Sequence, residues 1–540
     1  MSLRNRFVLM SVLATLAVLM GCSSTNKAAP PPTGGFNDSN LSGTYVFSTA
    51  GSDANGNFLT MLGAFTACGC TGGTISAGGS LVINDPEFGL TAPTAPLTIT
   101  GGSYTVGVDG RGTATLQAST PFQTPSIILD FVLTSTQGGL VSEFDNNGSG
   151  SGTLDLQSSV AQSDLTGTYV FNLAGVSIAS LTGEGVPLAT VGSVVLTGTS
   201  ATGIQDFNNN EAYSSQAISG GSITVGAPGT ASIGGLNFAV YPIDSTHLKF
   251  IETDPTPILV GDVFSQTSTS FPSSELAFTM TGFDYSTTLS GPLVVGGMMN
   301  SSGTAISNGV EDVNDAGVSN IASTATAPLS FTGGITQPTP SVGRFFVTLN
   351  SFANGAGGTT GSYTFVAYPS TGGTQLLEAD ALGITGGVAY PQDSTSFASG
   401  QGYGLNLTGF SFSAGTEADA IAEFTNADNV LTGLIDVNDA GATNSPQNFN
   451  ATYVPDSSNP GRALIEANNN GATPNLVSYT VDGTNTIFIE FDPGQLAVGS
   501  IGQQAAQSQG AIATRMAVLR PRVAAKGAWK KKPTAAGQGR

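Results

Sequence analysis

The amino-acid sequence predicts an all-β protein built from four tandem antiparallel β-barrel or β-sandwich domains of about 100–125 residues each. Two phrases recur after 124 residues: Leu41-Ser-Gly-Thr-Tyr-Val-Phe47 returns as Leu165–Phe171, and Gly309–Gly317 returns as Gly433–Gly441. A repeat of this length has the size of a small domain. The chain also combines 73 Gly and 27 Pro with 39% hydrophobic residues, which indicates turn-rich β structure rather than disorder.

The chain begins with the pattern of an export signal over residues 1–21. Arg4 and Arg6 precede an apolar run over residues 7–20, which is too short to cross a bilayer of about 30 Å. The sequence Leu19-Met-Gly-Cys22 that follows resembles the lipobox of bacterial lipoproteins. The resemblance implies that Cys22 becomes the lipidated first residue of the mature chain, anchored stably by several acyl chains. With Ser23 next, it also implies the outer membrane; a plain secretory signal with a chance cysteine is the alternative.

Both flanks of the repeats differ from them in composition. Residues 22–40 are rich in Pro, Gly and Ser and are expected to form a flexible tether. Residues 506–540 are expected to form a disordered basic tail, because the last 26 residues hold eight Lys or Arg and no acid. Contact of this tail with an anionic surface, or with the acidic body, is the alternative.

The body between these flanks is strongly acidic. All 36 Asp and Glu residues lie between Asp38 and Asp492, whereas residues 28–514 contain only four cations: Arg111, Lys249, Arg344 and Arg462. Such a body repels nucleic acid, so no nucleic-acid partner is expected for the domains. A glycan or a small apolar ligand stays open as a partner.

The repeats divide the body into domains over residues 41–160, 161–270, 271–398 and 399–505. In the first domain, short runs rich in Thr, Val, Ile and aromatic residues alternate with Gly, Asn, Asp and Ser. These runs cover residues 44–47, 63–66, 101–106, 112–116, 127–133 and 140–144. The second domain repeats the order, with its clearest hairpin over residues 238–252. The third opens at Leu276 and the fourth at Tyr403.

About eight strands per domain, joined by successive hairpins, favour an up-and-down barrel over a sandwich. This arrangement resembles the lipocalin and avidin outline, although no signature of either family is present. No long segment keeps a helical period.

Residues suited to catalysis are scarce. His247 is the only histidine, lies in a hairpin and is expected at the surface, and no nucleophile motif accompanies it. We therefore expect a protein that is not an enzyme. Cys68 and Cys70 occupy a hairpin tip and are expected to oxidise to each other in an exported protein. A redox or metal role for the two thiols is the alternative.

Two Asp- and Asn-rich stretches faintly resemble calcium loops. Their candidate ligands are Asp312, Asn314 and Asp315, and Asp436, Asn438 and Asp439. However, Ala316 and Ala440 stand where a third ligand belongs, and no Glu follows at the twelfth position. Asp and Asn before Gly also form ordinary turns. We favour turns and expect no cofactor, with calcium as the weaker alternative.

A Glu-x-Asp pattern ends the same strand in all four domains. The pairs are Glu143/Asp145, Glu252/Asp254, Glu378/Asp380 and Glu490/Asp492. Period-two alternation places each Glu on the face that carries apolar residues, at the rim of the core. Because an unpaired charge there is costly to desolvate, each Glu requires a partner. A carboxylate-pair glycosidase is the alternative use of these acids.

Three of the four body cations lie at one register, directly after a Gly. We predict a structural clasp within each domain: Arg111 with Glu143 or Asp145, Arg344 with Glu378 or Asp380, and Arg462 with Glu490 or Asp492. In the second domain Lys249 leaves the opposite strand face from Glu252, which is therefore expected to be unpaired or bonded to backbone.

These observations favour an envelope-anchored binding or structural surface module. A glycan hydrolase that uses carboxylates and a calcium-stiffened surface stalk are the alternatives.

Overall fold

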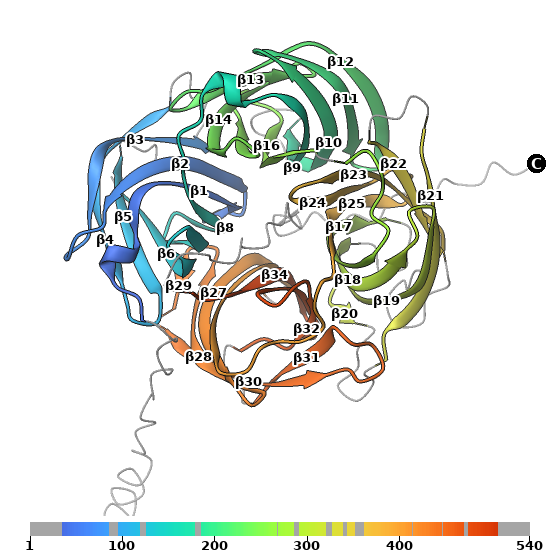
Figure 1. Ribbon diagram of the computed structural model, residues 1–540. Helices are drawn as coiled ribbons and strands as arrows, with labels where there is room; N and C mark the ends of the chain where they lie inside the picture. The colour runs from blue at the N-terminus through green and yellow to red at the C-terminus, as the bar shows by residue number, and fades with distance from the viewer. Residues whose placement is uncertain are drawn as a thin grey trace, which may run out of the picture.

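A computed structural model describes residues 35–505, except 86–95, 119–125, 179–184, 267, 286–290, 320–326, 339–342, 351–360, 413, 445 and 469–472. The described residues form four closed, eight-stranded antiparallel barrels, arranged as a ring (Figure 1). The predicted all-β class is thus confirmed, in its barrel form. The predicted signal peptide, Cys22, most of the predicted tether and the predicted basic tail lie outside the described residues.

The first barrel follows a short 3-10 helix, η1 (Asp38–Asn40), and closes by pairing its last strand with its first. Its strands are β1 (Ser42–Asp53), β2 (Phe58–Cys68), β3 (Thr74–Asn84), β4 (Leu97–Val106), β5 (Arg111–Ala118), β6 (Ser126–Ser135), β7 (Gly138–Phe144) and β8 (Gly148–Leu156).

The second barrel follows the helix η2 (Gln162–Asp164) and has the same strand order. Its strands are β9 (Gly167–Ile178), β10 (Gly185–Thr197), β11 (Ser200–Asn209), β12 (Ala212–Thr224), β13 (Gly229–Ile233), β14 (Leu236–Asp244), β15 (His247–Glu252) and β16 (Ile258–Ser265).

The third and fourth barrels each add a two-residue strand, β20 or β29, to the third strand of the barrel. Barrel 3 comprises β17 (Glu275–Asp284), β18 (Gly291–Ser301), β19 (Ala305–Asp315), β20 (Val318–Ser319), β21 (Leu329–Thr336), β22 (Phe345–Leu349), β23 (Tyr363–Ser370), β24 (Gly373–Glu378) and β25 (Gly383–Pro391). Barrel 4 comprises β26 (Gln401–Ser411), β27 (Thr416–Ala427), β28 (Val430–Asp439), β29 (Ala442–Thr443), β30 (Gln447–Pro455), β31 (Arg462–Ala467), β32 (Leu476–Thr480), β33 (Asn485–Glu490) and β34 (Gln495–Gln503).

The repeated Gly-Thr-Tyr-Val-Phe phrase supplies both faces of the first strand of a barrel. Tyr45 and Phe47 point into the core of barrel 1, whereas Val46 points outward and packs against barrel 2. The Tyr45 hydroxyl is satisfied because it donates to the carbonyl of Thr136 at 2.9 Å. A large aromatic side chain with one polar tip therefore fills the barrel end without leaving a buried polar atom unpaired.

The Asn-Asp-Ala-Gly phrase forms a two-residue hairpin turn. Asp315 pairs with Val318, which leaves Ala316 and Gly317 as the loop. Both loop residues have positive φ, 48° and 82°, as a type I′ turn requires. The turn interpretation of this phrase is therefore confirmed.

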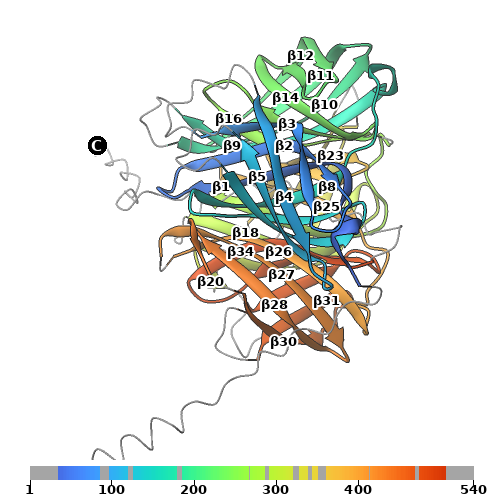
Figure 2. The same ribbon diagram turned by 90° about the vertical axis from the view of Figure 1, so that its left-hand side faces the viewer.

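Neighbouring barrels pack head to tail around the ring. The first two strands of each barrel contact the last three strands of the next: β1 and β2 contact β14–β16, β9 and β10 contact β23–β25, and β17 and β18 contact β32–β34. The fourth interface joins β26 and β27 to β6–β8 and closes the ring between the last and first barrels. Figures 1 and 2 show the arrangement from two directions. A head-to-tail contact closes in this way only when its rotation fits the number of units.

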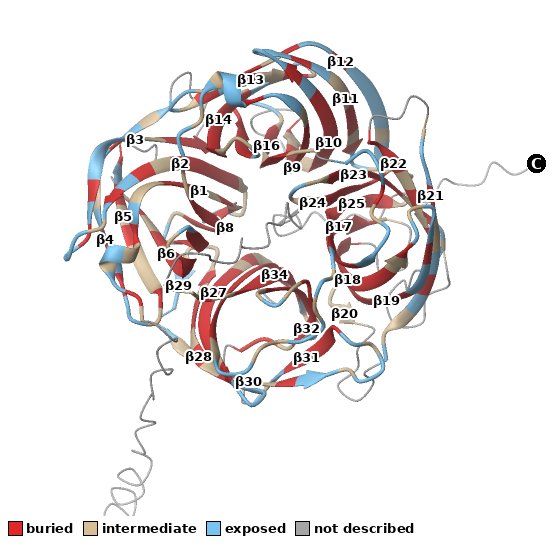
Figure 3. Ribbon diagram, viewed as in Figure 1, coloured by how far each residue is buried: buried red, intermediate tan, exposed pale blue. Residues whose placement is uncertain are grey.

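Burial follows the ring. Strands that face the neighbouring barrels are buried along most of their length, as in β17 and β25. Exposed residues gather on the outer strands, such as β4 and β12 (Figure 3). Each barrel therefore has two buried layers, its own interior and the faces it shares with its neighbours.

Candidate functional site

The Asp of each Glu-x-Asp pair holds the backbone of a neighbouring strand. Asp380 accepts the backbone N–H of Thr364 at 2.7 Å, and Asp492 accepts that of Asn475 at 2.8 Å. Equivalent bonds join Asp145 to Ile128 and Asp254 to Asn237. The recurrence is explained by this structural task, which every barrel requires.

The Glu of each pair lies inside its barrel and is almost fully buried, with exposed fractions of 1%, 0%, 1% and 3% for Glu143, Glu252, Glu378 and Glu490. Burial first, and the adjacent Asp second, raise the pKa of Glu252 to about 9. The same causes raise the pKa of Glu490 well above its usual range. A pKa of about 9 keeps Glu252 protonated at neutral pH, and burial favours the neutral form of the other three glutamates, which lowers their need for a cationic partner.

The predicted pairing of each arginine with a Glu or Asp of its own domain is wrong. Arg111 binds Asp436 at 2.5 Å, Arg344 binds Asp206, and Arg462 binds Asp312 at 2.7 Å. In each case the aspartate belongs to the preceding barrel in the ring. The reason is strand alternation, because the glutamates face the barrel interior and the arginines face outward.

The ion pairs of Arg344 and Arg462 are buried inside their interfaces, and each includes a tyrosine. Arg462 and Asp312 have exposed side-chain fractions of 1% and 0%. Asp312 also accepts the hydroxyl of Tyr479 at 2.5 Å, and Asp206 accepts that of Tyr368. Arg462 forms two parallel hydrogen bonds to Asp312, of 2.7 and 2.9 Å. This two-bond geometry satisfies the carboxylate that would otherwise be costly to bury.

The interface between barrels 1 and 2 lacks this pair on both sides. Val82 takes the position of the aspartate, two residues before Asn84. Gly229 pairs with Val240, so the residue at the arginine register is Pro228. An apolar cluster that includes Val46, Val82, Tyr241 and Ile251 fills the space. Loss of both charges together avoids leaving one of them buried alone.

A second charged cluster lies beside this apolar interface. His247 is 2% exposed, so the expected surface position is wrong. Its Nε2 lies 2.6 Å from Asp262, which also accepts Lys249 Nζ at 2.8 Å. Lys249 lies 3.8 Å from Asp155 of barrel 1. Burial alone would raise the pKa of Asp262, but Lys249 and His247 outweigh it and hold this pKa well below its usual range.

The predicted Glu252 arrangement agrees with the contacts. Its Oε1 accepts the backbone N–H of Asn237 at 3.1 Å. Lys249 leaves the other face of the strand and binds Asp262 instead. A backbone partner thus replaces a cation in this barrel.

Sequence reasoning missed two amide side chains that join every pair of neighbouring barrels. An Asn near the end of the third strand donates to a Glu carbonyl of the next barrel: Asn84 to Glu252, Asn208 to Glu378, Asn314 to Glu490 and Asn438 to Glu143, at 2.8–3.0 Å. A Gln after the last strand donates to another carbonyl: Gln157 to Pro242, Gln266 to Pro369, Gln392 to Thr480 and Gln504 to Leu133. Their recurrence at one register of each repeat was the available signal.

Five of the six candidate calcium ligands bind other groups of the protein. Asp312 and Asp436 bind arginines, and Asn314 and Asn438 join neighbouring barrels. Asp439 accepts the Thr416 hydroxyl at 2.5 Å, and alternation turns Asp315 away from Asp312. No group of three or more His, Cys, Asp or Glu suited to a metal occurs in the described part of the chain. The calcium hypothesis therefore has no support in the arrangement of these residues.

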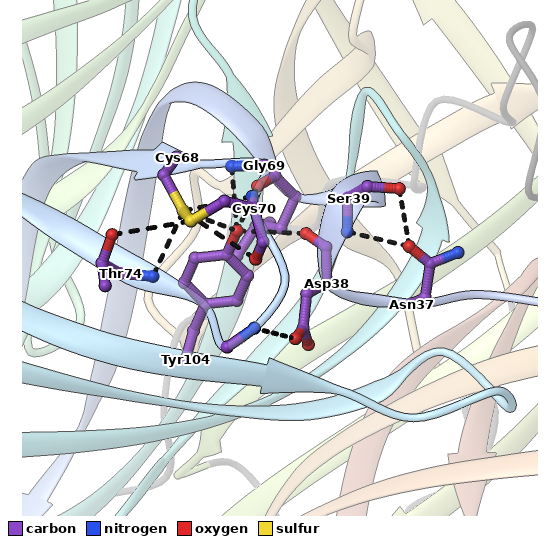
Figure 4. Close-up of a disulfide and its surroundings, with 10 residues drawn as sticks. Asn37, Asp38, Ser39, Cys68, Gly69, Cys70, Thr74 and Tyr104 are labelled. Atoms are coloured by element: carbon purple, nitrogen blue, oxygen red, sulfur yellow. Dashed lines mark hydrogen bonds between the residues drawn. A yellow bond between two sulfur atoms is a disulfide. The ribbon is translucent and has the colours of Figure 1, made fainter.

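Cys68 and Cys70 form a disulfide at the turn between β2 and β3 (Figure 4). The backbone N–H of Gly69, between them, donates to the Tyr104 hydroxyl at 2.9 Å. That hydroxyl in turn donates to the carbonyl of Asp38 in η1 at 3.0 Å. The bridged turn therefore fixes the end of barrel 1 at which the chain enters.

Barrel 4 contains a pocket of about 200 Å³ at the end of its interior. Apolar residues line most of it, including Leu407, Ala420 and Ile435, and Glu490 and Asp492 line one end. Burial first, and the adjacent Asp492 second, favour the protonated form of the Glu490 carboxyl group.

No protein-family model matches the chain, and no curated protein matches it. In the part of the chain that the structure describes, no helix is both long and apolar enough to cross a membrane. The functional proposals therefore rest on the residues and their contacts.

Proposed function

We propose that the chain is an exported lipoprotein, anchored to the bacterial cell envelope through Cys22, whose ring of barrels is a rigid structural or binding module. The repeated barrels fit such a module. The observation that carries the proposal is the recurrence of the same Asn and Gln joints at all four interfaces. Four independent domains joined by flexible linkers need no such joints, whereas a rigid ring of barrels that serves as a platform of fixed shape does.

The polar chemistry of the chain supports a structural role. The three arginines, the Asn and Gln amides and the Asp of each Glu-x-Asp pair bind other groups of the protein. Four identical copies of an active site in one chain would also be hard to explain, whereas four copies of a joint follow from the repeat. The acidic body keeps such a platform soluble and away from anionic lipid.

The proposed anchor is consistent with the place where the chain enters the ring. Phe36 is 2% exposed, and its backbone N–H donates to the carbonyl of Val108 at 3.0 Å. The described part of the chain begins at Gly35, a short distance in sequence after Cys22. A Pro- and Ser-rich tether of this length would hold the ring near the membrane while leaving its outer strands accessible.

Membrane fractionation tests the anchor. Cys22→Ala should move the protein from the membrane fraction to the soluble exported fraction, whereas the control Ser24→Ala should stay with the membrane. Retention of Cys22→Ala in the membrane fraction would rule out lipid anchoring at this residue.

The detergent sensitivity of the envelope tests the structural role. Gly404→Val, which should open the ring as argued below, is expected to reproduce the effect of deleting the gene while remaining anchored. Glu490→Gln should have no effect on the envelope. If Glu490→Gln made the envelope sensitive to detergent and Gly404→Val did not, the result would instead support chemistry at the Glu490 and Asp492 carboxyl groups.

A further inference from the structure

The pocket of barrel 4 arises from two small residues on one strand. Ala418 and Ala420 of β27 line it and pair with Gly409 and Leu407 of β26. Both alanines are followed on the same face by Ala422 and Phe424, which fill the deeper core. The space therefore lies between the packed core and the Glu490 end of the barrel.

The other three barrels carry larger side chains at the same two positions. The strand register identifies these positions, because each pairs with an equivalent residue of the first strand of its barrel. The position of Ala418 is held by Leu59, Leu188 and Leu293, and that of Ala420 by Met61, Thr190 and Val295. Since the fold accepts Leu at this position three times, the alanines of barrel 4 are not required by the fold.

The size of the space points to a small ligand. An aliphatic cavity of roughly 150 Å³ accommodates benzene, and this pocket measures about 200 Å³. Its walls of Leu407, Ile435 and Val437 offer apolar contact. A ligand with a single ring or a short aliphatic chain fits both the volume of the pocket and its apolar walls.

The polar end determines the ligand's charge. Glu490 is 3% exposed, and Asp492 beside it accepts the backbone N–H of Asn475 at 2.8 Å and its side-chain amide at 2.5 Å. No Lys, Arg or His lines the pocket. A positively charged hydrogen-bond donor would complement these two carboxyl groups better than the neutral amides of Asn475 do.

We propose that barrel 4 binds a small organic cation, a primary ammonium group on one ring or a short aliphatic chain. The apolar part lies against Leu407, Ala418 and Ala420, and the ammonium group donates to Glu490 and Asp492. The acidic body of the chain raises the local concentration of such cations. This inference goes beyond the envelope scaffold and does not depend on the anchor.

Calorimetric titration of the full chain with benzylamine, and with uncharged benzyl alcohol of nearly equal shape, tests the proposal. Benzylamine should saturate one site per chain and bind at least about tenfold more tightly than the alcohol. Ala418→Leu, which restores the residue of the other three barrels, should abolish binding of both compounds. Ala420→Val should weaken both, and thermal melting should show that each variant remains folded.

A matched pair of charge variants separates this site from general attraction to an acidic protein. Asp492→Asn should weaken benzylamine binding about tenfold or more and leave benzyl alcohol binding unchanged. Asp254→Asn makes the same change in barrel 2, where Leu188 and Thr190 occupy the space, and should change neither affinity. Absence of saturable benzylamine binding, equal binding by Ala418→Leu, or equal effects of the two Asn variants would overturn the proposal. None of these outcomes bears on the scaffold function, which the envelope experiments test separately.

Discussion

Asp312 of barrel 3 and Val82 of barrel 1 occupy equivalent positions. The charged residue has a charged partner in the neighbouring barrel, and the apolar residue has apolar neighbours. Asp312 faces Arg462, whereas Val82 lies in an apolar cluster with Tyr241. Buried ion pairs are often replaceable by apolar residues, but loss of one partner leaves an uncompensated charge. The chain therefore contains both solutions to the same packing problem.

This comparison predicts the stability of single and double variants at the interface of barrels 3 and 4. Asp312→Val should lower the free energy of unfolding by about 3 kcal/mol, the low end of the range for breaking a buried ion pair, because Arg462 then keeps only Asp456, at 3.0 Å and 16% exposed. Adding Arg462→Met should recover most of the loss, since the site then resembles the natural apolar interface. Chemical denaturation of the two variants measures both effects; a double variant less stable than the single one would contradict the prediction.

The burial and raised pKa of Glu423 predict how the stability of the protein depends on pH. It lies in the interface of barrels 4 and 1, is 0% exposed, and neither carboxyl oxygen has a hydrogen-bond partner among the described residues. Burial, with a smaller contribution from Asp109, raises its pKa to about 8 against the opposing effect of Arg111. The folded state therefore holds this proton more tightly than the unfolded chain, in which the pKa is about 4.3.

The sign follows from this difference. The contribution of Glu423 is fully present below about pH 4 and is lost as the pH rises through about 8, so stability should fall over this window. Glu423→Gln should flatten the decline and be the more stable protein at pH 9. Denaturation at several pH values compares the slopes, and parallel profiles for the two proteins would show that Glu423 does not titrate in this way.

At the scale of the elements, the first strand of each barrel sets how closely the next barrel approaches. Its outward position carries Val46, Val170 and Ala277 in the first three barrels and Gly404 in the fourth. A Cβ at Gly404 would lie 2.7 Å from Cγ1 of Val132 in barrel 1. The closing interface is therefore tighter than the others at this point and has a small apolar cluster, Val132, Leu140 and Ile421.

Gly404→Val should consequently open the interface between barrels 4 and 1 while leaving the other three closed. Valine itself suits the strand, as Val46 and Val170 show, so the effect should come from the contact with Val132. Hydrogen exchange should increase in β6–β8, β26 and β27 only. The control Gly334→Val, on β21 with nothing within 4 Å of the added Cβ, should leave hydrogen exchange unchanged. Equal exchange in the two variants would contradict the prediction that a side chain at position 404 separates barrels 4 and 1.

The sequence predicted the elements well and their partners poorly, for a physical reason. Strand runs and the Ala316-Gly317 turn depend on neighbouring residues, so local pattern suffices to predict them. The partner of Arg111 depends instead on which barrel lies beside its outward face, and period-two alternation does not carry that information. The buried position of His247 was missed for the same reason, because barrel 1 covers this hairpin of barrel 2.

At the scale of the whole molecule, the non-covalent junction between barrels 4 and 1 has the same geometry as the junction between barrels 1 and 2, which the chain itself connects. Ser158, just after barrel 1, donates its N–H to Ile243 of barrel 2 at 2.8 Å, and Ala505 donates to Thr134 of barrel 1 at 2.7 Å. The two segments that lead into the 3-10 helices are equally long: η1 begins three residues after Gly35, and η2 begins three residues after Ser159. Val160 and Phe36 then pack on their respective barrel cores in the same way.

A circular permutant should therefore fold without any added linker. Joining Ala505 directly to Gly35, and opening the chain between Ser158 and Ser159, makes the interface of barrels 4 and 1 covalent and that of barrels 1 and 2 the one that closes the ring. Because Gln157 still reaches the Pro242 carbonyl and the apolar cluster of Val82 remains, we expect the same ring with a melting temperature within a few degrees of the parent, equivalent to about 1 kcal/mol or less. Melting and hydrogen exchange measure this directly. Strong exchange throughout β14–β16 of the permutant would mean that the ring depends on chain continuity at that link rather than on the repeated joints, and that four equivalent interfaces are not what holds the molecule closed.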